Sequence, residues 1–432
     1  MQKKASLLAL IPILYFTVSG GPFGIEEIVS AVGPFYSLLL ILIIPIIWCI
    51  PEALIVGELT NLHPVQGGYY KWVQKAMGNF WGFMEGWWSI LYTLVDLALY
   101  PTLVVLYLKI LFPNLNFWAE YLIELSVIWF CVIINIYGIR TVGKILSVFK
   151  YFILILFVIF VVAGMKFLHG DFSYALHIPK ELKLTSVVYG LSIVFWNYIG
   201  FDNATTVLGE IENPKKNYLI GLFVLIPLIS LSYFFPVLVG VCIHKDWASW
   251  GFGEFTKISN AMGFHTLGTL MVIGGMFTFL GLFNSMILTS TRVFSSMSED
   301  GFLPKCFSVL TPSHSAPKNA IIFCGVMYSI LVLLGFNQLV VYDVFLYLIA
   351  IFLEAISLLV LRKTNNHNEI KFKIPFGITG LYFTVGIVCF IILLVAILQL
   401  ACIITSVSTL IITFAFVFSG VPIYLYFRRY QV

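Results

Sequence analysis

The chain has 432 residues, of which 60% are hydrophobic and only 10% are charged, and its mean hydropathy is +1.01. A soluble domain carries about 25% charged residues, so this composition excludes a water-facing surface and predicts an integral membrane protein that has the lipid bilayer as its solvent. The net charge of +4 is not gathered into a basic patch, so no nucleic-acid partner is expected. The seven cysteines are scattered without metal-ligand spacing, so neither a metal nor another cofactor is expected.

Twelve apolar stretches are long enough to cross a bilayer, because about 20 apolar residues span its hydrocarbon core. They cover residues 6–32, 35–60, 81–112, 121–139, 145–168, 186–209, 218–243, 266–297, 319–336, 341–361, 376–398 and 402–427. The connections are short, so we expect a single all-α transmembrane domain over residues 1–432. The stretch 63–78 is predicted to lie at the membrane interface.

The distribution of Lys and Arg predicts the orientation of these spans, since cytoplasmic loops carry an excess of both. With the amino terminus in the cytoplasm, the cytoplasmic segments hold 17 of these residues and the opposite side holds 6, leaving Lys150 aside. An even number of spans returns the chain to the same side. We therefore predict a multi-pass protein of the cell membrane with both termini in the cytoplasm.

The first predicted span is interrupted by Gly20, Gly21, Pro22, Phe23 and Gly24. Proline removes a backbone donor and glycine weakens a helix by about 1 kcal/mol, so this run cannot continue a helix. A break inside a bilayer is tolerated where the freed backbone faces protein or a wet cavity. The alternative to a binding site at this break is a simple kink.

The sixth span has a matching interruption between Phe195 and Asn203, where polar residues and Gly200 replace apolar ones. Breaks in the first and sixth spans occupy equivalent positions in two halves of five spans each. Such a pair is typical of an inverted repeat with a substrate site between the halves. We predict one repeat over residues 6–168, a second over 186–361, and two additional helices over 376–427.

The helix ends at the two breaks offer backbone groups to a ligand. Freed amides near Gly20, Gly21 and Gly24 present positive partial charge to an anion such as a carboxylate. Pro22 lacks an amide, which weakens the expectation of a strictly zwitterionic ligand. Freed carbonyls along 195–199 are able to accept hydrogen bonds from an ammonium group.

Several carboxylates fall within predicted spans, where a charge costs about 2.5–3.5 kcal/mol. Asp96 lies midway along the third span, with Tyr92 and Tyr100 one helical turn away on the same face. Asp202 lies in the second break and Glu354 in the tenth span. Together these carboxylates favour a cation: an amine substrate, a proton or both. The alternatives are a structural hydrogen bond for Asp96 and helix capping for Asp202.

Four glutamates and one lysine lie in or beside the first, second and fifth spans. Glu26 and Glu27 follow the first break, and Glu52 and Glu58 lie in the second span. Positions near water at helix ends are the alternative for Glu27 and Glu58. Lys150 is either a desolvated lysine that switches charge with proton transfer or a side chain that extends to the cytoplasmic face.

Aromatic side chains at the breaks are candidates to close over a ligand or stack on an ammonium group. They are Phe23, Tyr92, Phe195, Trp196, Tyr198 and Phe201, and Asn197 lies among them. For any single ring, packing against the core or lipid is the alternative.

In its order of motifs the sequence resembles the amino acid–polyamine–organocation superfamily. The motifs lie at 20–24 (GGPFG), 67–69 (GGY), 82–83, 86–87, 135–138 (NIYG), 195–202, 209–216 (GEIENPKK), 292–304 (RVFSSMSEDGFLP), 316–317 and 373–377 (KIPFG). Three stretches, 20–27, 96–101 and 345–361, resemble the polyamine-uptake branch in particular, and a bacterial amino acid permease of this branch is equally compatible.

The resemblance implies a LeuT-type fold of about twelve helices in which both breaks line the substrate site. Proton-coupled relatives carry a lysine on the fifth span, which Lys150 matches, so the resemblance implies a role for Lys150 in proton coupling. Glu26 and Glu27, the carboxylates after the first break, are the other candidates for this role. The expected function is a secondary transporter of amino acids or polyamines, with protons as the coupling ion.

Other classes of function are distinguished by what they require. An exchanger, or a sensor or channel that binds without pumping, could keep the same site. An intramembrane enzyme needs a motif such as HExxH or GxSxG, and an ATP-driven pump needs a Walker A motif; the sequence contains none of these. We therefore do not expect an enzyme.

Overall fold

The structure is a computed structural model that describes residues 4–333, 336–364, 371–403 and 407–429. Within these ranges its regular elements are helices, and the only strand-like pairing is an isolated parallel bridge between Ala5 and Ile211. The α-helices are α1 (Leu7–Val18), α2 (Glu27–Val32), α3 (Pro34–Ile44), α4 (Ile50–Leu62), α5 (Gly68–Met77), α6 (Asn79–Leu111), α7 (Phe117–Ile136), α8 (Gly138–Leu168), α9 (Leu184–Trp196), α10 (Pro214–Ile243), α11 (Glu254–Ala261), α12 (His265–Glu299), α13 (Lys318–Leu331), α14 (Phe336–Thr364), α15 (Gly377–Ile403) and α16 (Val407–Arg428).

Short helices of other types complete the chain. The π-helix η1 covers Pro45–Cys49, and the 3₁₀ helices are η2 (Ser173–Leu176), η3 (Asn203–Glu210), η4 (Trp247–Ser249) and η5 (Lys305–Ser308). Seven helices in the described part are long and apolar enough to cross a membrane. This confirms an all-helical, multi-pass membrane protein, while the count of twelve spans stays a prediction.

The two predicted interruptions are present in the structure. α1 ends at Val18 and α2 begins at Glu27, and α9 ends at Trp196 before η3 begins at Asn203. Gly21 and Gly200 have φ values of +112° and +103°, which residues with a side chain rarely adopt. A Cβ on Gly200 would lie 2.4 Å from the carbonyl oxygen of Thr17 in the first span. Glycine at 200 therefore permits the two broken segments to touch.

The second predicted span, 35–60, is one helical rod with a π turn in its middle. Pro45 begins this turn and has no N–H to donate to the carbonyl of Ile41, four residues earlier. The hydroxyl of Tyr198 donates to that carbonyl over 2.9 Å. The Cys49 thiol at the end of the turn donates to the Tyr198 carbonyl over 3.7 Å. A proline in the second span thus anchors the break of the sixth.

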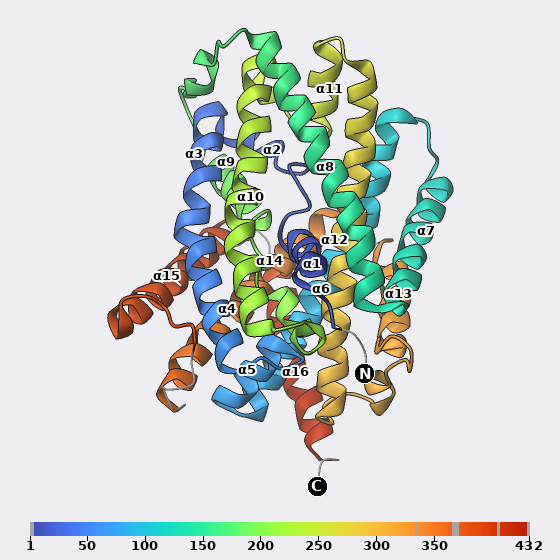
Figure 1. Cartoon of the computed structure of the whole chain (residues 1–432), viewed down its shortest axis with the longest axis vertical. Helices are drawn as coiled ribbons and strands as arrows, with labels where there is room; N and C mark the ends of the chain where they lie inside the picture. Colours follow the sequence, from blue (N-terminus) through green and yellow to red (C-terminus); the bar gives the residue numbers. More distant parts are fainter. Residues whose placement is uncertain (1–3, 334–335, 365–370, 404–406, 430–432) are drawn as a thin grey trace.

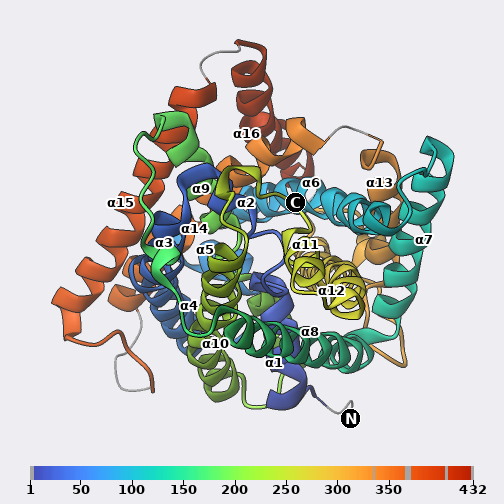
Figure 2. The ribbon, with the colours of Figure 1, turned by 90° about the horizontal axis from the view of Figure 1, so that it is seen from above.

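The helices form a bundle with α1 at its centre, packed against α8, α10 and α12 (Figure 1). α7 and α15 lie at opposite edges of this bundle in both views (Figure 2). Along α8, exposed apolar residues recur at Val148, Tyr151, Ile155, Val158 and Val162, one side of a helix. The opposite side of α8 is buried against α1 and α10, so lipid and core faces alternate as expected for a peripheral helix.

The ion pairs are grouped here by the side of the membrane on which the sequence predicts their segments to lie. One group holds Lys71–Asp300 and Arg292–Glu210, which join segments that the Lys and Arg distribution places in the cytoplasm. The other holds Lys109–Glu120 and His244–Glu254, on segments predicted to face the opposite side.

Candidate functional site

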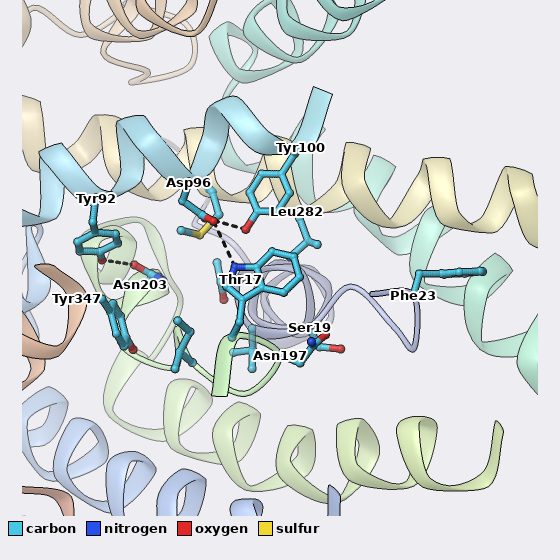
Figure 3. Close-up of a pocket in the computed structure, with 14 residues that line it drawn as sticks. Thr17, Ser19, Phe23, Tyr92, Asp96, Tyr100, Asn197, Asn203, Leu282 and Tyr347 are labelled. Carbon is cyan, nitrogen blue, oxygen red and sulfur yellow. Dashed lines mark hydrogen bonds between the residues drawn. The ribbon is translucent and has the colours of Figure 1, made fainter. Parts of the chain in front are cut away.

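A cavity of about 30 Å³ lies where the two broken segments meet α6 and α12. Most ligand pockets enclose about 300–1,000 Å³, so an organic ligand fits here only if lining side chains move. The lining residues are Thr17, Val18, Ser19, Phe23, Tyr92, Asp96, Tyr100, Trp196, Asn197, Ile199, Asn203, Leu282, Met286 and Tyr347. Figure 3 shows Tyr92 and Tyr347 at one end of this set and Phe23 at the other, beyond α1.

Asp96 is the carboxylate of this cavity and is 5% exposed. Tyr100 donates to its Oδ2 over 2.7 Å, and the indole nitrogen of Trp196 donates to its Oδ1 over 3.4 Å (Figure 3). Both donors are neutral, and no Lys, Arg or His of the described residues forms an ion pair with Asp96. A buried carboxylate with only neutral donors is suited to binding a cation.

Aromatic rings surround Asp96. Tyr100 stacks on Trp196 with ring centroids 6.4 Å apart, and on its other neighbour, Phe279 of α12, at 6.5 Å. At the other end of the cavity, away from Asp96, Phe23 packs edge-on against Tyr107 and Phe157 (Figure 3). Ring faces attract ammonium groups, so they complement the carboxylate for an organic cation.

The amides of the first break are occupied by the chain itself. Gly21 N–H donates to Ser19 Oγ over 3.0 Å, and Gly24 N–H donates to Glu26 Oε2 over 2.9 Å. Gly20 N–H donates to the carbonyl of Tyr15 over 3.2 Å. The cradle that sequence reasoning assigned to a carboxylate ligand is therefore filled, in this structure, by Glu26 and Ser19.

A single tyrosine joins the two breaks. The Tyr233 hydroxyl on α10 lies 2.6 Å from Ser19 Oγ and donates to the carbonyl of Asn197 over 3.0 Å. On the other side, Thr278 of α12 donates to the carbonyl of Gly20 over 2.8 Å. These contacts hold the first and sixth segments against each other and against both flanking helices.

The structure brings five of the predicted substrate residues into the cavity lining: Phe23, Tyr92, Asp96, Trp196 and Asn197. Tyr92 donates to Asn203 Oδ1 over 3.0 Å. The other predicted substrate residues do not line the cavity: Gly20, Gly21, Pro22, Gly24, Phe195, Tyr198, Gly200, Asp202 and Glu354. Phe195 packs instead on Trp48, with ring centroids 5.5 Å apart.

Asp202 and Glu354 lie behind the cavity, beyond Tyr347. Tyr347 donates to Asp202 Oδ1 over 3.0 Å, and Asp202 makes no side-chain cap at the start of η3. Glu354 is 1% exposed.

The three residues predicted for proton coupling have different surroundings. Glu26 is fully buried and lies 3.3 Å from the Tyr107 hydroxyl. Glu27 is partly exposed and accepts a hydrogen bond from Tyr189 over 2.7 Å. Lys150 is 7% exposed, and its Nζ lies 4.2 Å from the ring centroid of Tyr151, on the lipid-facing side. None of the three lines the cavity.

Glu58 corrects another expectation. It is fully buried, with its Oε1 3.2 Å from Arg362 Nε and its Oε2 accepting from the Ile374 amide over 2.7 Å. The alternative of a position near water at a helix end is therefore wrong for Glu58, whose ion pair links α4 to α14.

Several residues that line the cavity around Asp96 were not predicted from the sequence. Thr17 and Ser19 were detectable as the polar residues directly before the Gly-Gly pair, and Asn203 as the neighbour of Asp202. Tyr347 lies two helical turns before Glu354 and carried no signal of its own. Leu282 and Met286 on α12 are ordinary apolar residues, and only the packing of α12 against α1 places them here.

A second, larger cavity of about 710 Å³ is lined by the start of α8, the end of α12 and the segment before α1. It shares no lining residue with the cavity around Asp96. Arg292, 1% exposed, lies at its wall with Nε 2.9 Å from Glu210 Oε1. Gln66 donates to the same oxygen over 3.1 Å, and the Ala5 amide donates to the Glu210 carbonyl over 2.8 Å.

A helical membrane bundle with a polar cavity between two broken segments is the architecture of many membrane transport proteins. Residues 13–421 match the model of the family described as amino acid permease. The chain belongs to this amino acid permease family; it is a transporter and not an enzyme.

The relatives with the strongest similarity include plant proteins. The polyamine transporter RMV1 of Arabidopsis thaliana is 33% identical over 380 residues, which cover 88% of this chain and 77% of that protein. The polyamine transporter PUT1 of Oryza sativa subsp. japonica is 29% identical over 382 residues, covering 88% and 71%. The probable agmatine/putrescine antiporter AguD of Lactococcus lactis is 25% identical over 341 residues, covering 77% and 71%.

Proposed function

We propose that the chain is a secondary active transporter of polyamines, within the wider class of amino acid and polyamine carriers. The observation that carries this proposal is the setting of Asp96: a buried carboxylate with neutral donors, surrounded by aromatic rings. An ammonium group supplies the missing positive charge and stacks on the faces of Tyr100 and Trp196.

The first break favours an amine over an amino acid as cargo. An amino acid brings a carboxylate, which needs free donors at the break. The amides of Gly21 and Gly24 are already bonded to Ser19 and Glu26. The names of RMV1, PUT1 and AguD, which refer to polyamines, agmatine and putrescine, support the same class of cargo.

The proposal includes alternating access around the cavity at Asp96. We propose a LeuT-type arrangement of twelve spans, with inverted repeats over 6–168 and 186–361, in the cell membrane with both termini cytoplasmic. The breaks at Ser19 and Asn197, joined by Tyr233, support it. Protons are the proposed coupling ion. The family resemblance supplies Lys150 as a candidate for proton coupling, and Glu26 and Glu27 are candidates as carboxylates that follow the first break.

The decisive experiment is uptake into proteoliposomes. Purified protein is reconstituted, and entry of labelled putrescine, spermidine, arginine and leucine is measured with and without an inward proton gradient, against protein-free vesicles. Saturable putrescine or spermidine uptake supports the proposal, while uptake of leucine alone contradicts the assignment of cargo. Counterflow of labelled cargo against unlabelled cargo separates a carrier from a sensor that binds without transport.

A further inference from the structure

Four buried carboxyl groups converge behind the cavity, each from a different segment. They are Glu52 of α4, Glu85 of α6, Asp202 in the second break and Glu354 of α14, and none is more than 2% exposed. Glu52, Glu85 and Glu354 each lie close enough to Asp202 for their charges to interact. Glu85 was not named from the sequence, and Glu52 was named only as a carboxylate inside the second predicted span.

The hydroxyl of Tyr347 is shared between two of these carboxyl groups. Its hydroxyl lies 3.0 Å from Asp202 Oδ1 and 3.3 Å from Glu52 Oε1, and it accepts from the Gly200 amide over 3.0 Å. A tyrosine hydroxyl has a single proton to donate. It therefore donates to one of the two carboxyl groups at a time. The two carboxylates repel each other unless one of them carries a proton of its own.

Glu85 and Glu354 have a greater deficit. No donor in the described structure bonds to either oxygen of Glu85 or either oxygen of Glu354. Glu354 has the carboxyl group of Asp202 as its near polar neighbour. Two buried ionised carboxylates facing each other repel strongly, whereas one shared proton converts the contact into a hydrogen bond.

Cations of the described residues do not neutralise this group. Arg362, which shares α14 with Glu354, pairs with Glu58; Lys71 pairs with Asp300, and Arg292 with Glu210. The other titratable groups that face the four carboxyls are uncharged hydroxyls and a thiol on the neighbouring segments: Cys49, Tyr69, Tyr92, Tyr218 and Tyr347. No three carboxyl, His or Cys groups of the described residues are arranged to hold a metal ion.

We propose that Glu85 and Glu354, with Glu52 and Asp202, form a proton-binding site that is linked to the substrate cavity through Tyr347. This inference rests on the proposed function, and it adds a group of carboxyls to Lys150, Glu26 and Glu27 as candidates for proton coupling. Four desolvated carboxylates cannot all be ionised together. A proton neutralises a carboxylate without occupying additional space, so protons fit this group.

The link to the cavity is structural. Tyr347 both lines the cavity and donates to Asp202, and its ring packs edge-on against Tyr92, with centroids 5.4 Å apart. On α6, Asp96, Tyr92 and Glu85 lie at intervals of four and seven residues, so they share one face over about 16 Å. Cargo that displaces Tyr92 or Tyr347 changes which carboxyl receives the tyrosine proton, and so changes proton affinity in the cluster.

The first test needs no cargo. Infrared spectra of the purified wild-type protein at neutral pH are compared with those of Glu85→Gln, Glu354→Gln and the exposed-loop control Asp171→Asn. We expect a band from protonated carboxyl groups that each Gln variant reduces and the control leaves unchanged. Absence of the band from the wild-type protein, or an unchanged band in both Gln variants, overturns the proposal. The wild-type spectrum decides the first point even if a variant does not fold.

The second test measures coupling. Proteoliposomes with a trapped pH dye report proton entry when putrescine is added outside. We expect wild-type protein and the exposed-loop control Asp171→Asn to move protons with cargo, and Glu85→Gln and Glu354→Gln to lose this movement by about tenfold. Cargo-driven proton entry that persists in both Gln variants overturns the inference. Wild-type uptake of putrescine without proton entry also overturns the inference. Absence of any wild-type counterflow refutes the proposed function instead.

Discussion

The indole nitrogen of Trp196 donates to Oδ1 of Asp96 over 3.4 Å, across 100 residues of sequence. Trp196 is the last residue of α9, so the position of its ring depends on where the sixth segment stops being helical. Asp96 lies mid-way along the continuous helix α6. A rigid helix thus supplies the charge, and a broken one supplies the ring that covers it.

Asp96→Asn should abolish tight binding of polyamines. The amide keeps the size of the side chain but removes the charge that attracts an ammonium group. Losing one partner of a buried charge pair costs about 2–5 kcal/mol, or at least about 30-fold in affinity. Competition by unlabelled putrescine in the uptake assay measures this loss, with Asp171→Asn as the control. An equal loss for putrescine and for a neutral amino acid would mean that Asp96 is structural.

Arg292→Met should destabilise the end of the bundle where Glu210 is found. Breaking a buried ion pair leaves an uncompensated charge and costs about 3–5 kcal/mol. We expect a lower melting temperature in detergent. The double change Arg292→Met with Glu210→Gln removes both charges and should recover much of the stability. Equal melting temperatures for the single and double variants would contradict this account.

Gly21→Ala should impair folding of the first break. Gly21 has φ +112°, and a Cβ there would lie 2.7 Å from Ile153 Cγ2 on α8. Strained backbone of this kind costs about 1–3 kcal/mol. The yield of monodisperse protein and its melting temperature measure the effect. Gly386→Ala on α15, where a Cβ meets nothing within 4 Å, is the matched control and should remain near wild type.

His63, just beyond the end of α4, should make stability depend on pH. Burial, together with the positive charges of Lys75 and Lys71, lowers its pKa from 6.5 to about 4. The unfolded chain therefore binds a proton between pH 6.5 and 4 that the folded chain does not, and stability falls as the pH falls through this range. His63→Gln should flatten the melting temperature between pH 7 and 4. A slope as steep as that of wild type would assign the effect to other groups.

The positions of the two breaks were predictable because they depend on local chemistry. Glycine and proline at 20–24, and polar residues at 197–203, cannot sustain a helix whatever surrounds them. Asp96 was predictable for the same reason, since a lone carboxylate in an apolar span is conspicuous. The partners of these groups were not predictable: the Tyr198 hydroxyl reaches the Ile41 carbonyl only because two distant spans lie side by side.

Sequence by itself determined that this chain is a helical membrane protein with two interrupted segments and buried acidic residues, because hydropathy and helix-breaking residues act locally. Only the tertiary structure decided which of those residues share a cavity. It placed Asp96 among aromatic rings, assigned the amides of the first break to Ser19 and Glu26, and grouped Glu52, Glu85, Asp202 and Glu354 behind Tyr347. Helices that are far apart in sequence present these groups to one another through packing, and packing depends on the whole bundle.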